Sequence, residues 1–525
     1  MSDFVLDPYV LSADRFLAAK SGYLLTPIPD EDYRMLVDDF FGALETIACS
    51  RSREEFDVFL SDITFGVFII QSIHIRAIAR YCERHRMRFV EGKFFASLLS
   101  PNFQSLAGWY EDRVSIRNRS KDMLRACRTW SWGRELKNGV RIDFPHISRR
   151  MPISIGLSQP LKEEYIWQTG IHSLVIAEPA VFSRRVRWRK EIERRYKREL
   201  IKPLFDVVTE KNRIFARNAS SSYADTWARR LATAHAIYQS FLDLKTLPEL
   251  LLVSGTSNPL RKLFATALQH RECEVVGFHH GNDIGARVME HAHRAEASHL
   301  KKFICPSMGI VANYQESYSV TETEKTSGTK YKSLNSTFYS ELVDRLGQRG
   351  NDSEPGAAQK IMLMGRPLNN LRLLDSYGAF FLHKIDMEVR LVKICQEAGY
   401  NVSYKAHPEW AEVARLIFTV PGLEIIDRPF EEVWQQADLY LFTTATSSTF
   451  EFALATTKSV ILLDAIGNKW RSRCRSDLEQ RCEIIDYATD KFGRATLNEN
   501  QLFSAFSSAR DKRLKSSSIV KWMAD

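Results

Sequence analysis

The feature that most constrains this fold is an alternation of short apolar strands and amphipathic helices, which stops at a polar stretch and then resumes. Before the stretch, residues 249–255 and 273–283 have the pattern of buried strands, separated by a helical pattern. After it, residues 360–367, 400–409 and 438–444 alternate with helical patterns in the same way. This order is typical of doubly wound parallel sheets. Because 525 residues exceed what one core supports, we predict an α/β protein with two facing Rossmann-like domains.

The domain boundaries follow from the same patterns. Residues 1–58 are expected to form an N-terminal helical extension, and 59–320 an N-terminal Rossmann-like domain for an acceptor. This domain is predicted to open with a strand at 65–71, a helix at 75–86 and a strand at 87–92, and to carry a helical insertion at 182–245. Residues 321–359 are weakly hydrophobic, which predicts a linker. Residues 360–525 are then the C-terminal domain.

The charge balance favours anionic partners. Lys and Arg number 73 and Asp and Glu 64, giving a net charge of +9. The most basic segment is 184–198, within a helical pattern. It predicts either an ordinary solvated helix face or a surface that docks on an anionic membrane.

The eight cysteines are dispersed and form no C-x-x-C pair, which indicates reduced thiols and a cytoplasmic protein. The first residues have neither a basic start nor an apolar core, and no window has the roughly 18 uncharged apolar residues of a membrane span. We expect at most peripheral contact, at the inner membrane face.

Two strand ends in the C-terminal half carry groups suited to phosphate. Ligands of open parallel sheets bind at the carboxyl ends of strands. Lys405, His407 and Pro408 end one predicted strand; the proline prevents further pairing. Ser447, Ser448, Thr449 and Glu451 follow another, where hydroxyls and free amides at a helix start could hold a phosphate and the acid a ribose hydroxyl. The alternative is an ordinary helix cap, since Ser448 and Glu451 have capping-box spacing.

Two strand ends in the N-terminal half offer a catalytic base. Glu91 follows an apolar strand and precedes Gly92, and a carboxylate beside a sheet can act as a general base. The sequence FHHGND offers His280 and Asp283 as alternatives. No further ligand lies at metal spacing, so we expect no metal. A Walker A loop and a G-x-G-x-x-G motif are both missing from the sequence.

Together, FVEGKFF, KAHPE and SSTFEFAL resemble motifs of bacterial surface-polysaccharide glycosyltransferases of the GT-B type, especially capsule-synthesis proteins of the Kdo-transferase kind and related CMP-sialic acid enzymes. The resemblance covers about residues 60–470. It implies a CMP-activated sugar acid as donor, a saccharide or lipid-linked acceptor and no cofactor. Glu91 would be the catalytic acid/base, His407 would hold the nucleotide phosphate, and Ser447 and Ser448 would complete the phosphate site. The lone acid before Gly92 departs from the family pattern.

A second family is also similar, the polyol-phosphate transferases that use CDP-glycerol or CDP-ribitol, and it would give the base role to His280. A third alternative is a basic nucleic-acid-binding protein. No zinc, helix-turn-helix or RNP-like signature accompanies the charge, so we expect no nucleic-acid partner.

Overall fold

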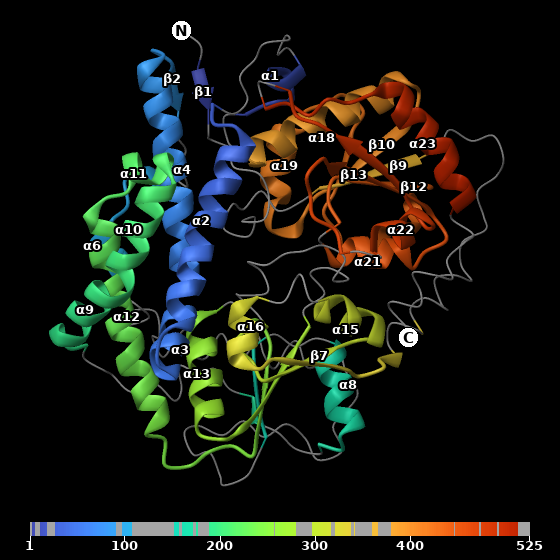
Figure 1. The fold of residues 1–525 in the computed structure, drawn as a ribbon. Helices are drawn as coiled ribbons and strands as arrows, with labels where there is room; N and C mark the ends of the chain where they lie inside the picture. The colour runs from blue at the N-terminus through green and yellow to red at the C-terminus, as the bar shows by residue number, and fades with distance from the viewer. Residues whose placement is uncertain are drawn as a thin grey trace.

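The computed structural model describes most of the chain: residues 3–5, 11–17, 27–90, 97–107, 152–156, 160–171, 175–176, 188–256, 258–279, 297–316, 321–337, 341, 360–365, 380–445, 447–471, 474–490 and 493–512. These residues form two six-stranded parallel sheets, each with helices around it, and a two-stranded sheet (Figure 1). The prediction of two doubly wound α/β domains is confirmed. We call them the N-terminal and C-terminal lobes.

The sheet of the N-terminal lobe has the order β4-β3-β5-β6-β7-β8, and its described pairs are all parallel. Its strands are β3 (Ile153–Ile155), β4 (Val175–Ile176), β5 (Leu250–Val253), β6 (Glu274–Phe278), β7 (Lys302–Cys305) and β8 (Lys330–Ser333). Helices α8 (Pro160–Gln168), α13 (Pro259–His270), α15 (Met308–Gln315) and α16 (Glu322–Ser327) alternate with the strands.

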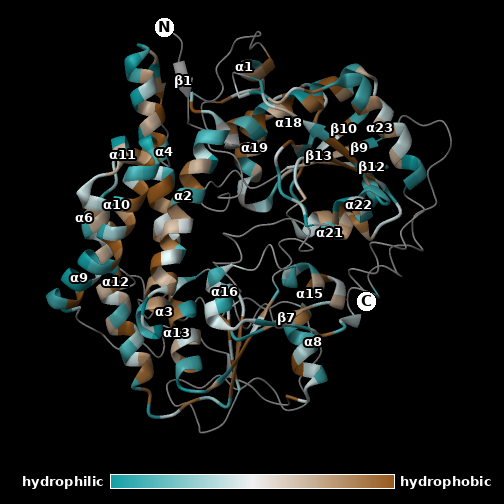
Figure 2. Cartoon of the chain, viewed as in Figure 1, coloured by the Kyte–Doolittle hydropathy of each residue, from teal (hydrophilic) through white to brown (hydrophobic). Residues whose placement is uncertain are grey.

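The sheet of the C-terminal lobe has the order β11-β10-β9-β12-β13-β14, again parallel, which is the 3-2-1-4-5-6 order of dinucleotide-binding folds. Its strands are β9 (Lys360–Met364), β10 (Asn401–Lys405), β11 (Glu424–Ile426), β12 (Leu439–Phe442), β13 (Ser459–Ala465) and β14 (Glu483–Tyr487). The helices are α18 (Phe380–Glu397), α19 (Ala411–Ile417), α20 (Phe430–Val433), α21 (Ser448–Leu454), α22 (Cys474–Glu479) and α23 (Glu499–Lys512). All residues of β12 and β13 are buried, because helices cover both faces of the sheet, and Figure 2 shows these strands as hydrophobic.

The prediction of a strand at 65–71 is wrong. These residues belong to α4 (Ile63–Arg84), a 22-residue helix. A short apolar run fits a buried helix as well as a buried strand, and here the apolar pattern continues for six turns. Gly66 lets α4 pack closely, since a Cβ there would lie 3.1 Å from the ring of Phe40 and 3.4 Å from that of Trp227.

The strand expected near 87–92 is present as β2 (Arg88–Val90), but in a different place from the one predicted. It pairs with β1 (Asp3–Val5) in the separate two-stranded sheet, and so does not open the sheet of the N-terminal lobe.

The N-terminal region is helical, as predicted, but it is part of both lobes. Helices α2 (Asp30–Cys49), α3 (Arg53–Ser61) and the first half of α4 pack in the core of the N-terminal lobe, with α9 (Lys190–Tyr196), a π-helical turn (Lys197–Ile201), α10 (Lys202–Lys211), α11 (Arg213–Asn218) and α12 (Ser221–Leu242). Ile75, Ile78 and Cys82 of α4 and Phe16 of α1 (Ala13–Leu17) belong to the core of the C-terminal lobe.

The prediction that a linker begins at residue 321 is wrong. Helix α16 and strand β8 occupy 322–333, and β8 pairs with β7 at the edge of the N-terminal sheet. Thr321 caps α16 in a capping box with Glu324, and Gly328 ends the helix in the left-handed region. The polar sequence here reflects an edge position rather than a linker.

Among the described helices, α4 alone is long and apolar enough to cross a membrane, and 67% of its most apolar window is buried inside the protein. Its side chains join both cores, which is the packing of a core helix. The seven described cysteines form no disulfide.

Candidate functional site

The most favourable place for a ligand is the carboxyl edge of the C-terminal sheet at β9. The chain order reverses between β9 and β12, and ligands bind at such switch points. Met364 of β9 pairs in register with Lys405 of β10 on one side and Phe442 of β12 on the other. The two predicted phosphate-binding segments therefore begin at the same edge, about 10 Å apart at two strand spacings of roughly 4.8 Å.

A buried carboxylate joins the strands at this edge. Glu388 of α18 accepts hydrogen bonds from Tyr404 Oη and Thr443 Oγ1, each at 2.9 Å. Gly365 lies beneath the phenol, since a Cβ there would be 2.2 Å from Tyr404 Oη. Burial and the neighbouring Glu388 hold the pKa of Tyr404 well above its usual range. This network fixes the ends of β10 and β12, and sequence patterns did not predict it.

Two buried ammonium groups lie at the same edge. Lys384 of α18 donates from Nζ to Thr443 O at 2.6 Å, and Lys405 donates from Nζ to Ala406 O at 2.7 Å. Burial lowers the pKa of Lys405, while Glu431 and Asp427 act in the opposite direction. An ammonium group has three donors, so this hydrogen bond leaves Lys405 capacity for an anion. Lys384 was missed from sequence, because it lies on a helix rather than at a strand end.

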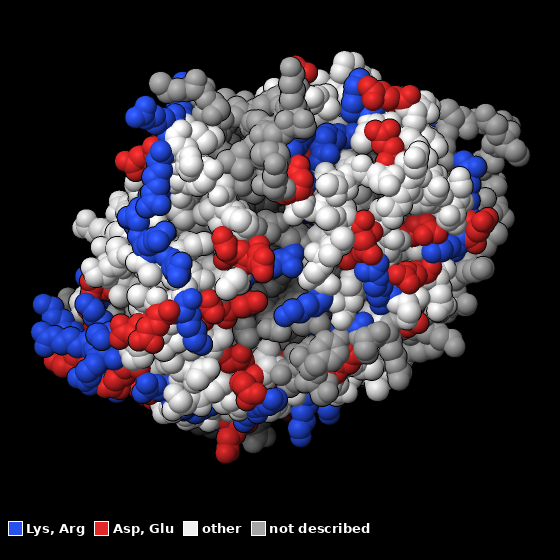
Figure 3. Space-filling view, turned by 45° about the horizontal axis from the view of Figure 1, so that its top comes forward, with Lys and Arg blue, Asp and Glu red and all other residues white. Residues whose placement is uncertain are grey.

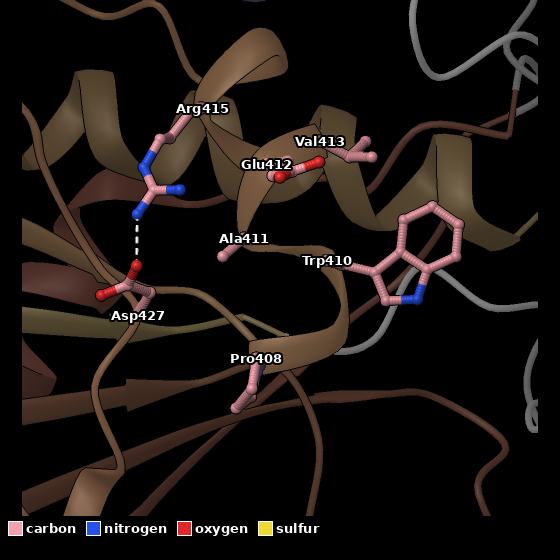
Figure 4. A pocket seen from close by; sticks show the side chains of 7 residues that line it. All are labelled: Pro408, Trp410, Ala411, Glu412, Val413, Arg415 and Asp427. Carbon is pink, nitrogen blue, oxygen red and sulfur yellow. Dashed lines mark hydrogen bonds and ion pairs between the residues drawn. The ribbon is translucent and has the colours of Figure 1, made fainter.

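Pro408 lines a surface pocket of about 490 Å³, and His407 directly precedes it in the chain. The pocket is lined by Pro408, Trp410, Ala411, Glu412, Val413, Arg415 and Asp427. Figure 4 shows the ion pair of Arg415 with Asp427 on one side and the indole of Trp410 on the other. The hydrogen bond from Arg415 lowers the pKa of Asp427. His407 is half-buried, and its carbonyl accepts from Trp410 N at 2.9 Å, in the turn that starts at Pro408.

The segment 447–451 forms a helix cap. Ser447 is the N-cap of α21, and its Oγ accepts from Phe450 N at 3.1 Å. The capping box expected between Ser448 and Glu451 is not the observed cap. Ser448 is exposed and Thr449 half-buried, whereas Glu451 is buried at 4% exposure. The structure thus leaves Ser448 and Thr449 open to a ligand, uses Ser447 to start the helix, and buries the acid expected to face a ribose.

The predicted catalytic residues Glu91, His280 and Asp283 lie outside the described residues. Their strands are described, however. Glu91 follows β2, which is not part of the N-terminal sheet, while His280 follows the central strand β6. His279 at the end of β6 is buried and packs edge-on against Tyr314 of α15, with ring centroids 5.8 Å apart.

Contacts across the two lobes begin at this same tyrosine. The guanidinium of Arg471, which follows β13, lies 5.3 Å from the centre of the Tyr314 ring, and its Nη1 donates to Asn313 O. Cys474 Sγ donates to Asn313 Oδ1 at 3.3 Å. His279, Tyr314 and Arg471 therefore place the carboxyl end of β6 next to the loop after β13. The carboxyl edges of the two sheets meet here.

Within the described residues, no group of three or more His, Cys, Asp and Glu side chains has an arrangement that could hold a metal ion.

Comparison with known proteins gives only distant structural likenesses. No family model and no curated protein matches the chain. The glycotransferase of kitacinnamycin has a TM-score of 0.33 at 11% identity, covering 71% of this chain and 95% of its own. The glycosyltransferase SnogD from Streptomyces nogalater has a TM-score of 0.29 at 12% identity, covering 72% and 96%.

The catalytic domain of starch synthase IV from Arabidopsis thaliana, bound to ADP and acarbose, has a TM-score of 0.31 at 9% identity, covering 72% and 96%. The class that the fold defines, a protein of two doubly wound α/β lobes, follows from the strand order of this chain.

Proposed function

We propose that this protein is a glycosyltransferase that moves a CMP-activated sugar acid, of the Kdo or sialic acid type, onto a saccharide or lipid-linked acceptor in capsule or lipopolysaccharide synthesis. The observation that carries the proposal is the switch point at β9, where Lys405, His407 and Ser448–Thr449 flank one edge of the C-terminal sheet. The contact of His279, Tyr314 and Arg471 brings the N-terminal lobe to the same edge, where it would hold the acceptor.

The residues at this edge have distinct roles in the proposal. Lys405 and His407 hold the phosphate of CMP, and the hydroxyls of Ser448 and Thr449 add hydrogen bonds. CMP is a good leaving group, so positioning, charge stabilisation and one base suffice, without a metal ion. Glu388 is a positioning residue, since it fixes the strand ends that carry Lys405 and Thr443.

In this proposal His280 or Asp283, rather than Glu91, is the catalytic base. The specific observation is the position of β6, a central strand whose carboxyl end meets the other lobe, whereas β2 lies outside that sheet. The same observation favours, as a second candidate, a transferase of polyol phosphate from CDP-glycerol or CDP-ribitol, in which His280 is the base.

Thermal-shift binding of nucleotides tests the proposal. CMP at about 100 times its Kd should stabilise the protein by about 2.7 kcal/mol. His407→Ala should lose this shift, and the matched control His270→Ala, an exposed histidine on α13, should retain it. Equal shifts with CMP and UMP, or none with any nucleotide, would contradict the assignment.

A donor screen separates the two candidates. CMP-Kdo and CMP-sialic acid should be consumed in the first, and CDP-glycerol in the second. Glu91→Gln should leave turnover within a few-fold of wild type, while His280→Ala or Asp283→Asn should reduce it by the factor of roughly 10²–10⁴ expected for a general base. A large loss only in Glu91→Gln would return the base role to Glu91.

A further inference from the structure

The C-terminal end of α4 and the junction of α10 and α11 form a cluster of cations, which we call the basic patch. It consists of Arg76, Arg80, Arg84, Arg86, Lys211, Arg213 and Arg217. All seven are exposed except Arg76, which is half-buried. Arg80 Nη1 donates to Arg217 O, so the two elements are in contact. The acidic side chains within these same segments are Glu83 and Glu210.

None of the seven cations takes part in an ion pair within the described chain. The basic helix singled out from sequence is different. Arg195 pairs with Glu55 at 3.5 Å, Lys197 with Asp225, and Arg198 with Glu199. Figure 3 shows this contrast: blue side chains run down the left of the molecule over α4 and α11 with little red, whereas blue and red mix at the left edge, over α9.

Arg86 closes the C-terminal end of α4 in a backbone conformation that glycine adopts more easily. It follows the end of α4 with φ +53°, in the left-handed region that favours glycine at this position. Arg86 N donates to Glu83 O at 3.2 Å and Met87 N to Cys82 O at 2.8 Å, which closes the helix as a Schellman motif. Glycine would close it with less strain, so Arg86→Gly removes this charge and keeps the helix end.

Two structural explanations account for only part of the basic patch. Cations near the C-terminus of a helix interact favourably with its dipole, which suits Arg84, but the effect is confined to the last turn. Arg80 also fixes α11. Neither explanation applies to Arg213 at the first position of α11, where the dipole disfavours a cation.

We infer that the basic patch docks the protein on the anionic phospholipid surface of a membrane. Guanidinium groups bind phosphodiesters through paired donors, and cations near an anionic bilayer each add roughly fivefold to its binding. Nucleic-acid surfaces usually add aromatic platforms for bases. Of the aromatic side chains in these segments, Phe215 is buried, and Tyr81 is half-buried and stacked on His85 at 4.1 Å. The purpose of docking, access to a lipid-linked acceptor, rests on the proposed function. The docking itself does not depend on that function.

Vesicle co-sedimentation of the full chain, without donor or acceptor, tests the docking. The protein should bind vesicles of phosphatidylglycerol and phosphatidylcholine, not phosphatidylcholine alone, and 0.5 M NaCl should release it because salt screens exposed charges. The triple variant Arg84→Gln, Arg86→Gly, Arg213→Gln should bind on the order of 100-fold more weakly. Its Tm should not fall, since glycine suits position 86.

The matched control removes the same charge from the other basic helix: Lys190→Gln, Arg194→Gln, Arg198→Gln. We expect this variant to lose less than tenfold in vesicle binding. Equal losses in both triple variants would reduce the effect to net charge and overturn the inference. Binding of a single-stranded oligonucleotide in preference to the vesicles, lost in the patch variant, would overturn it in favour of nucleic acid. If the wild-type protein did not bind CMP, the proposed function would be refuted, but the vesicle-binding results would still support membrane docking.

Discussion

At the scale of single residues, the edge of the C-terminal sheet depends on one buried carboxylate. Glu388 is fully buried and accepts from hydroxyls at the ends of two strands, β10 and β12, that are not neighbours in the sheet. Tyr404 reaches it across Gly365 on the strand between them. A glycine, a tyrosine, a threonine and a glutamate thus form one unit, although they are spread over about 80 residues of sequence.

Removing this carboxylate should be costly. Glu388→Ala leaves two buried hydroxyls without their acceptor, and we expect a loss of about 2–4 kcal/mol in the free energy of unfolding. Tyr404→Phe removes one donor and keeps the acceptor, so it should cost less. Denaturant titration measures both, and a cost in Tyr404→Phe equal to that in Glu388→Ala would contradict the network.

Buried histidines should make the protein less stable in acid. Burial lowers the pKa of His74 to about 3 and that of His383 to about 4. Both are neutral in the folded protein, while the unfolded chain takes up their protons below pH ~6.5. Stability is therefore lost as the pH falls through this range, by about 2 kcal/mol per histidine between pH 6.5 and 5.

Asp57 acts in the opposite direction. Burial raises the pKa of Asp57 to about 6, against the influence of Arg53. The folded state therefore takes up this proton at a higher pH than the unfolded chain, which raises the free energy of unfolding by about 1 kcal/mol between pH 7 and pH 5. The histidines outweigh this single group. We expect denaturant unfolding at pH 5 to show a net loss of a few kcal/mol relative to pH 7, and His74→Phe to show a smaller loss. Equal stability at the two pH values would show that these histidines are not held neutral.

At the scale of elements, α4 is the part that joins the lobes. Its first half lies in the core with Phe40 and Trp227, and its second half places Ile78 and Cys82 in the core of the C-terminal lobe. At 1.5 Å per residue, a helix of this length spans about 33 Å. A rigid rod held at both ends restricts how the lobes can move.

Truncation of Ile78 should measure this connection. Ile78 is fully buried, so Ile78→Ala should lower the free energy of unfolding by about 2–5 kcal/mol and Ile78→Val by about 0.5–1.5 kcal/mol. Thermal unfolding monitored by circular dichroism gives both values. If neither variant changes the midpoint, α4 does not pack there.

At the scale of the whole molecule, polar groups that are far apart in sequence close the structure. Asp386 accepts from Arg390 and from Arg494, and Arg494 also donates to Phe16 O at 3.2 Å, which ties α1 to the C-terminal lobe. Arg471 ties the loop after β13 to α15 of the N-terminal lobe. The lobes are thus connected by a helix on one side and by a buried guanidinium on the other.

Loss of the second connection should loosen the lobes. Arg471 is 1% exposed, and Arg471→Ala removes the hydrogen bond to Asn313 O and the contact of the guanidinium with the ring of Tyr314. We expect a larger radius of gyration in solution scattering and a Tm lower by several degrees. Lys469→Ala, an exposed neighbour, is the control. Unchanged scattering in Arg471→Ala would mean that other contacts, such as α4 and the hydrogen bond from Arg34 to Gly467 O, set the arrangement.

The sequence determined those features that repeat locally. Strands β5, β6, β9, β10 and β12 coincide with predicted apolar runs, because a buried parallel strand must be apolar on both faces. The segments at 405–408 and 447–451 were placed at strand ends for the same reason, since polar residues after a buried strand mark its carboxyl end.

Tertiary structure alone decided the rest. An apolar run such as 65–71 suits a strand or a helix, and only packing against Phe40 and Trp227 settles it as part of α4. Edge strand β8 is too polar to recognise, and β2 pairs with residues at the other end of the N-terminal region. Glu388, Lys384 and Arg471 have no local signal, because their partners lie 16 to 158 residues away, and the chain must fold before they meet.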